Sequence, residues 1–189
     1  MTEKKLEGCR VAIIATDLFE EAELIEPRKA LQEAGAETVV IAPQSGEIQA
    51  VRHDEKTQKV KVDKTLDQAK PADFDAVLLP GGAMNADALR MDDKAQQFVQ
   101  QFDREGKPIA VICHGPWLLI SAGLVKGRHM TSYKTIQDDL KNAGAIWTDQ
   151  PHVRDRNWVS SRHPGDIPQF NKNMIELFSE ARQKTHKAA

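Results

Sequence analysis

A chain of 189 residues can bury a substantial core without disulfides or metal ions. Its formal net charge of −2 gives no general attraction to nucleic acid or anionic membranes, and no apolar run approaches the length of a membrane span. Two cysteines, Cys9 and Cys113, are too few for a disulfide framework and have no metal-ligand spacing. We therefore expect one cytoplasmic domain over residues 1–189, without a metal, a cofactor, a nucleic-acid partner or a membrane anchor.

Short apolar runs alternate along the chain with segments of helical spacing. In chain order the pattern predicts strands at 11–15, 38–42, 76–79, 109–112, 145–147 and 158–161, and helices at about 20–34, 95–102, 117–122, 135–142 and 170–181. Pro27 predicts that the first turn of the first helix is separate. The polar segment 44–64 predicts short strands or a hairpin. Continuous apolar strands between helices indicate an α/β fold, a flavodoxin-like three-layer sandwich whose mostly parallel central sheet has helices on both faces.

The predicted strand at 109–112 stops at Cys113, and Gly115 and Pro116 permit a sharp turn before the next helix. A sulfur at this point stands at the carboxyl edge of the sheet, where ligands of such folds bind. The helix dipole and nearby backbone N–H groups predict a lowered thiol pKa. The arrangement is that of a strand–nucleophile–helix elbow, with Cys in place of Ser. A small buried core cysteine is the alternative, but the position before a His-Gly-Pro turn favours a reactive centre.

Further groups are expected at the same edge of the sheet. Glu20 either forms a capping box with Asp17 or, kept protonated by burial, donates a hydrogen bond to the sulfur. The Gly81-Gly82 pair forms either a simple turn or, with the N–H of His114, an oxyanion hole. His114 either acts as a base or shapes the turn, and His163 is a rival base after the last strand.

Four motifs resemble the PfpI/ThiJ family. They are Ala-Thr-Asp-Leu-Phe-Glu-Glu-Ala-Glu-Leu at 15–24, Leu-Leu-Pro-Gly-Gly at 78–82, Val-Ile-Cys-His-Gly-Pro-Trp-Leu-Leu-Ile-Ser-Ala-Gly at 111–123 and Trp-Val-Ser-Ser-Arg at 158–162. That family comprises intracellular cysteine protease-like proteins, protein deglycases and general stress proteins within the class I glutamine-amidotransferase-like superfamily. The likeness spans a core of about residues 9–181.

The resemblance implies a flavodoxin-like sandwich with Cys113 as nucleophile, Glu20 as the acid touching its sulfur and His114 as the histidine beside it. It also implies that Gly82 lies near the oxyanion position. In protease-like members an acid from a neighbouring subunit completes a triad with this histidine. Asp87 is the nearest candidate, after one inserted residue, so the resemblance implies a homodimer or a larger assembly.

Two functions follow from these expectations. The first is a stress-related, cofactor-free cysteine hydrolase that acts on glyoxal or methylglyoxal adducts of proteins or small molecules, or on peptide bonds. The second is a non-enzymatic, redox-sensing or chaperone-like stress protein that uses the same oxidisable cysteine. Glutamine hydrolysis is disfavoured, because His163-Pro164-Gly165 lacks the glutamate of the His-Pro-Glu sequence in true amidotransferases.

Overall fold

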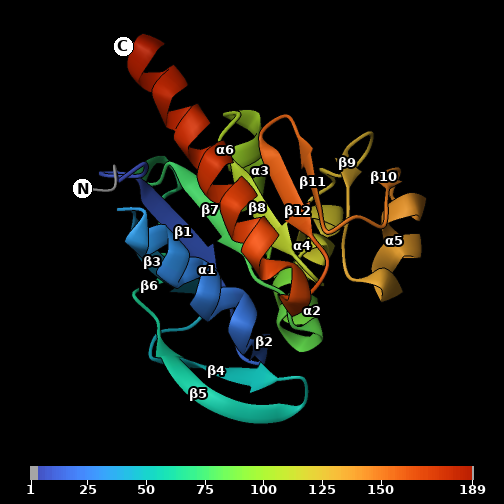
Figure 1. Ribbon diagram of the computed structural model, residues 1–189. Helices are drawn as coiled ribbons and strands as arrows, with labels where there is room; N and C mark the ends of the chain where they lie inside the picture. Colours follow the sequence, from blue (N-terminus) through green and yellow to red (C-terminus); the bar gives the residue numbers. More distant parts are fainter. Residues whose placement is uncertain (1–3, 189) are drawn as a thin grey trace.

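A seven-stranded sheet forms the middle of the molecule in the computed structural model, which describes residues 4–188 (Figure 1). Its strand order is β11-β12-β8-β7-β1-β3-β6. Neighbouring strands are parallel except for β11, which pairs antiparallel with β12 at one edge. The bounds are β1 (Arg10–Ile14), β3 (Glu37–Ala42), β6 (Lys64–Thr65), β7 (Ala76–Leu79), β8 (Ile109–Ile112), β11 (His152–Asp155) and β12 (Trp158–Ser161).

Helices cover both faces of this sheet (Figure 1). Helices α1 (Glu21–Glu33) and α6 (Ile167–Ala188) pack together on one face. The other face carries α2 (Ala83–Arg90), α3 (Asp93–Arg104), α4 (Pro116–Ser121) and α5 (Gln137–Asn142). Three short 3₁₀ turns complete the helical segments, at η1 (Pro71–Asp73), η2 (Lys134–Ile136) and η3 (Pro164–Asp166).

The central strands are buried on both faces, as their unbroken apolar runs predict. Along β1, Val11 and Ile13 pack into the core beneath α1 and α6, whereas Ala12 and Ile14 pack into the core beneath α3 and α4. This alternation follows from the two-residue period of a strand. The predicted flavodoxin-like sandwich with a mostly parallel sheet is confirmed.

Two small sheets lie outside the central one. The segment predicted to hold short strands or a hairpin contains β4 (Glu47–Arg52) and β5 (Glu55–Lys61), an antiparallel pair. The short strand β2 (Phe19–Glu20) pairs in parallel with β4, and this places the hairpin beside the start of α1. The second small sheet pairs β9 (His129–Met130) with β10 (Ile146–Trp147).

The predicted break at Pro27 is wrong, because α1 is continuous through it. Proline removes a single N–H from the ladder of helical hydrogen bonds. Helix α1 keeps its course because it packs against both α6 and β3, and Pro27 itself is buried. Tertiary packing therefore outweighs the local cost of the proline.

Other elements also differ from the sequence pattern. The strand predicted at 145–147 forms, but it pairs with β9 and not with the central sheet. Helix α2 and strands β2, β9 and β11 were not predicted. Within residues 4–188, no helix has the length and apolar character needed to cross a membrane.

Candidate active site

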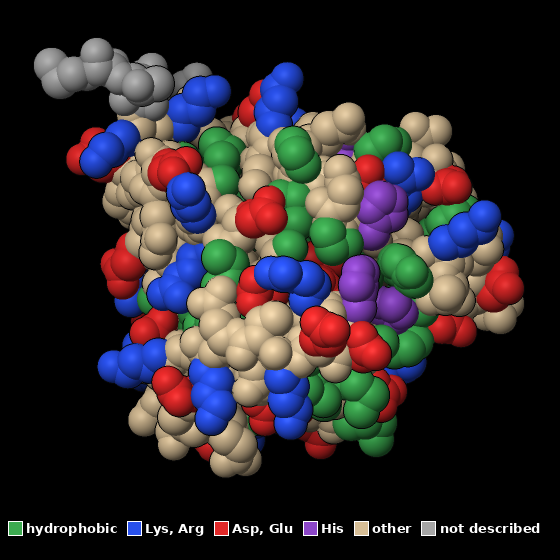
Figure 2. All heavy atoms as spheres, turned by 60° about the horizontal axis from the view of Figure 1, so that its bottom comes forward, with side chains coloured by type: hydrophobic (Ala, Val, Ile, Leu, Met, Phe, Trp, Pro, Cys, Tyr) green, Lys and Arg blue, Asp and Glu red, His purple; other side chains and the backbone are tan. Residues whose placement is uncertain are grey.

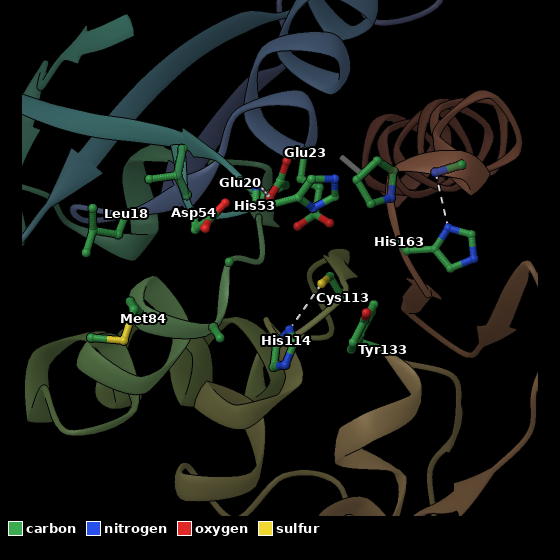
Figure 3. Close-up of a pocket in the computed structure, with 15 residues that line it drawn as sticks. Leu18, Glu20, Glu23, His53, Asp54, Met84, Cys113, His114, Tyr133 and His163 are labelled. Carbon is green, nitrogen blue, oxygen red and sulfur yellow. Dashed lines mark hydrogen bonds between the residues drawn. The ribbon is translucent and has the colours of Figure 1, made fainter. Parts of the chain in front are cut away.

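The carboxyl ends of β1, β7, β8 and β12 meet at one edge of the sheet, next to the β4–β5 hairpin. A cavity of about 730 Å³ opens there. Figure 2 views the molecule with this edge turned forward, and histidine side chains gather on that face. Figure 3 shows Cys113 in the middle of the cavity, with His53, Glu20 and Glu23 on one side and His114 and Tyr133 on the other. The residues that line it are Leu18, Glu20, Glu23, Val51, His53, Asp54, Gly82, Ala83, Met84, Cys113, His114, Tyr133, His163, Pro164 and Gly165.

Cys113 stands between β8 and α4 with a positive φ of 62°. Only a few per cent of non-glycine residues adopt this conformation, and it persists where the surroundings hold it. Here its N–H donates to the carbonyl of Ser161 (3.1 Å), and its own carbonyl accepts from the N–H of Tyr133 (2.9 Å). A Cβ at Gly115 would come within 2.9 Å of two carbonyl oxygens, so the turn needs glycine. The elbow expected at Cys113 is therefore present.

Glu23, and not Glu20, is the acid against the sulfur. Glu23 is fully buried in the first turn of α1, and its carboxyl group interacts with the Cys113 thiol. One carboxyl oxygen, Oε2, accepts the N–H of Gly81 (2.8 Å). The other, Oε1, is buried and accepts no hydrogen bond from the part of the chain that the structure describes.

The expectation for Glu20 was wrong because the chain at Phe19–Glu20 is an extended strand and the helix begins at Glu21. The carboxyl group of Glu20 accepts the backbone N–H of His53 at the tip of the hairpin (3.1 Å). The alternative reading, a capping box, is also absent. Glu20 makes no side-chain capping bond, and Asp17 accepts the N–H of Gln49 (2.7 Å).

The two glycines after β7 have different roles. The N–H of Gly81 is used by Glu23 and is not available to an oxyanion, which corrects the expectation for this residue. A Cβ at Gly81 would come within 2.4 Å of Glu23 Oε2 and 2.6 Å of Cys113 Cβ, so only glycine lets the acid and the cysteine approach. The N–H groups of Gly82 and His114 both interact with the sulfur and lower the pKa of the thiol. These are the two backbone donors that the site offers to a developing negative charge.

Burial dominates the acid–base behaviour of the pair. It raises the pKa of the Glu23 carboxyl to about 8, and the charge of Glu20 adds to that rise. Burial also raises the pKa of the Cys113 thiol, a charged Glu23 raises it further, and the N–H groups of Gly82 and His114 lower it. The lowered thiol pKa expected from the helix dipole is thus wrong, because desolvation outweighs the backbone dipoles. Near neutral pH Glu23 keeps its proton, so the sulfur faces an uncharged acid.

His114 is placed to take a proton from the thiol. Its Nδ1 lies 3.2 Å from Cys113 Sγ (Figure 3). Its Nε2 lies 3.4 Å from the hydroxyl of Thr135, and its ring stacks on Tyr133 with centroids 4.9 Å apart. Burial lowers the pKa of His114, which favours the neutral imidazole that a base requires.

The other two expected residues stand further from the sulfur. His163 lines the cavity, but its Nδ1 accepts the N–H of Gly165 within its own turn (3.2 Å). Asp87 is exposed on α2 and does not line the cavity of its own chain. Sequence reasoning missed Glu23 and the two hairpin-tip residues that line the cavity, His53 and Asp54. An acid one position before Leu24, on the side of α1 that turns toward the core, was the available signal for Glu23.

Comparison with known proteins identifies a family and relatives that this chain resembles. The pattern that defines the DJ-1/PfpI family matches residues 9–177. "Deglycase TK1284" from Thermococcus kodakarensis is 45% identical over 168 residues, which cover 89% of this chain and 98% of the relative. "Putative cysteine protease YraA" from Bacillus subtilis is 41% identical over 168 residues, or 89% of this chain and 97% of the relative.

The fold also matches solved structures. A crystal structure of a two-domain protein from Anabaena variabilis, with DJ-1/ThiJ/PfpI-like and ferritin-like domains, superimposes with a TM-score of 0.83 at 35% sequence identity. The match covers 89% of this chain and 47% of that chain, so the present chain spans about half of that larger protein.

Proposed function

The chain belongs to the DJ-1/PfpI family, and from this premise we propose that its Cys113 pocket removes glyoxal-type adducts from amino and guanidino groups. The protein is a cysteine hydrolase of the PfpI type. The observation that carries the choice of substrate is Glu23, a buried acid against the nucleophile whose pKa of about 8 lets it give and take a proton near neutral pH.

Consider a methylglyoxal adduct of an amine, R–NH–CH(OH)–CO–CH₃. The thiol attacks the carbinol carbon as its proton passes to His114 Nδ1, the S–C bond forms and the C–N bond breaks. The amine leaves as R–NH₂ and takes the proton held by His114. The product on the enzyme is the hemithioacetal Cys–S–CH(OH)–CO–CH₃, whose oxygen faces the N–H groups of Gly82 and His114.

The next step moves a proton between neighbouring carbons. The protonated carboxyl group of Glu23 gives its proton to the ketone oxygen and takes the proton of the sulfur-bearing carbon, which forms an enediol. It then returns that proton to the adjacent carbon and recovers a proton from the hydroxyl group of the first carbon. The first carbon is oxidised and the second reduced, and the result is the thioester Cys–S–CO–CH(OH)–CH₃. Water then breaks the S–C bond, which releases lactate and restores the thiol. The overall change consumes one water and needs no external oxidant.

Peptide hydrolysis is the second candidate, because the sulfur and His114 have the spacing of a nucleophile–base pair. A triad needs an acid to orient the histidine, but its Nε2 contacts the neutral hydroxyl of Thr135. We propose that Asp87 of a second copy supplies this acid in a homodimer or larger assembly, since it is exposed on α2. A cytoplasmic location is part of this proposal and accords with two free thiols.

The test measures amine and lactate together. The protein is mixed with the methylglyoxal adduct of N-acetylarginine in the presence of excess aminoguanidine, which traps any free dicarbonyl. We expect N-acetylarginine and lactate in equal amounts, at a rate above spontaneous adduct dissociation. Cys113→Ala should abolish the excess rate, whereas Cys9→Ala, which changes a buried cysteine that does not line the cavity, should keep it.

Two results would contradict the proposal. Release that never exceeds spontaneous dissociation would mean that the pocket does not act on the adduct. Equal rates for the wild type and Cys113→Ala would remove the nucleophile from the reaction. In the latter case, mass spectrometry after mild peroxide treatment would test the redox-sensing alternative at Cys113.

A further inference from the structure

The wall of the cavity opposite His114, formed by Glu20, His53 and Asp54 (Figure 3), carries negative charge. Three carboxyl groups, those of Glu20, Glu23 and Asp54, line the cavity. Among the lining residues, all of them in the described part of the chain, none is lysine or arginine. Glu23 is neutral near pH 7, so the remaining fixed charge belongs to Glu20 and Asp54.

The nearest arginines in sequence do not offset this charge, because each already pairs with a carboxylate. Arg52, next to the hairpin tip, lies 3.3 Å from Glu21. Arg162, next to His163, lies 2.8 Å from both Asp149 and Asp166. Within residues 4–184, no lysine or arginine pairs with Glu20 or Asp54. The wall therefore presents negative charge that the fold itself does not neutralise.

Glu20 is held in place at this wall and does not swing free. It is 9% exposed, lies in the β2–β4 pairing and accepts the N–H of His53. His53 adopts a positive φ of 60° in a two-residue turn, a position where a non-glycine residue is strained. The charge of Glu20 is felt at the reacting centre, since it contributes to the raised pKa of Glu23.

We propose that the wall formed by Glu20, His53 and Asp54 selects adducts whose carrier group is cationic, the guanidinium of arginine above all, over adducts carried by phosphate-bearing bases. The proposal rests on the function proposed above and names its preferred substrate class. Attraction to two carboxylates and repulsion of a phosphate act in the same direction. We expect kcat/KM for the adduct of N-acetylarginine amide to exceed that for the adduct of guanosine monophosphate by at least about tenfold.

The charge selection can be tested without any turnover. Cys113 is modified with two methanethiosulfonates of similar size, the cationic 2-aminoethyl reagent and the anionic 2-sulfonatoethyl reagent, at pH 7.5. Each rate is divided by the rate for a free small thiol, and mass spectrometry confirms that Cys113 is the modified residue. The normalised ratio of cation to anion should be roughly ten or more and should fall as salt is added.

Matched variants identify the residues responsible. Glu20→Gln and Asp54→Asn should each lower the ratio several-fold and narrow the kcat/KM difference between the two adducts, chiefly through KM. Glu47→Gln, an exposed position at the far end of β4, should leave both unchanged.

Each outcome decides one of the two proposals. A normalised ratio near one in the wild type, or a ratio unchanged in both Glu20→Gln and Asp54→Asn, overturns the charge selection even if adducts are turned over. A ratio of ten without adduct turnover would support the charge selection and overturn the proposed function.

Discussion

Replacing Glu23 by glutamine removes the one buried acid that contacts the nucleophile, and its effect on stability follows from its pKa. Glutamine keeps an oxygen for the N–H of Gly81 and cannot ionise. In the wild type the pKa of Glu23 rises from an ordinary 4.5 to about 8. At about 1.4 kcal/mol for each pH unit, this rise corresponds to roughly 4–5 kcal/mol.

The sign of this contribution to stability follows from the number of protons that the folded and unfolded states bind. Between pH 4.5 and about 8 the unfolded chain has lost the Glu23 proton whereas the folded protein still holds it. The unfolded state binds fewer protons, so this residue lowers the free energy of unfolding as the pH rises across that window. Glu23→Gln lacks this dependence. Its free energy of unfolding relative to the wild type should therefore increase by about 2–3 kcal/mol between pH 5.5 and 7.5.

Urea unfolding followed by circular dichroism at pH 5.5, 6.5, 7.5 and 8.5 measures this difference. Glu26→Gln, an exposed position one turn further along α1, is the control and should give a difference that does not vary with pH. If the difference in free energy of unfolding between Glu23→Gln and the wild type stays constant from pH 5.5 to 8.5, the reasoning is refuted. Glu23 would then be ionised in the folded protein, and its role as a proton carrier would fail with it.

Three further predictions concern the backbone and the core. Gly81→Ala places a Cβ 2.4 Å from Glu23 Oε2 and 2.6 Å from Cys113 Cβ, so the rate of adduct turnover should fall by about 10²-fold or more. Cys113→Ala gives the background rate. A Gly81→Ala rate within threefold of the wild type would contradict this placement. Cys113→Gly should be about 1 kcal/mol more stable to urea than Cys113→Ala, because φ is 62° there; the reverse order would mean that the elbow is unstrained. Arg128 pairs with Asp103 and lies over the ring of Trp158, 4.1 Å from the ring centroid. Arg128→Ala should therefore lower the free energy of unfolding by about 3 kcal/mol. The control Arg104→Ala, at the end of α3, should change this free energy little. Equal melting temperatures for the two arginine variants would show that the pair contributes nothing.

The fold could be read from the sequence where local signals and burial agree. Strands β1, β7 and β8 are unbroken apolar runs, because both of their faces are buried, and Cys113 at the end of β8 was found by its turn. Strand β11 was missed because an edge strand with one exposed side carries a polar sequence. Helix α2 was missed because it is short and follows directly on a glycine pair that indicates a turn.

The acid of the site could not be assigned from spacing alone. Glu20, Glu21 and Glu23 are close in sequence, and which one points at the sulfur depends on where the helix begins. The helix begins at Glu21 because Phe19–Glu20 pairs with β4, some thirty residues later in the chain. A partnership at that separation leaves no local signal in the sequence.

The sheet formed by β2, β4 and β5 shares no hydrogen-bonded strand with the seven-stranded sheet that carries Cys113. The tip of the hairpin and the nucleophile thus follow strands of two different sheets. Changes at positions 52–55 alter one side of the cavity without replacing a residue of the elbow or a backbone partner that holds it. Libraries confined to that turn therefore offer a route to new adduct preferences in the laboratory, and gene duplication followed by drift at the same turn offers a natural one.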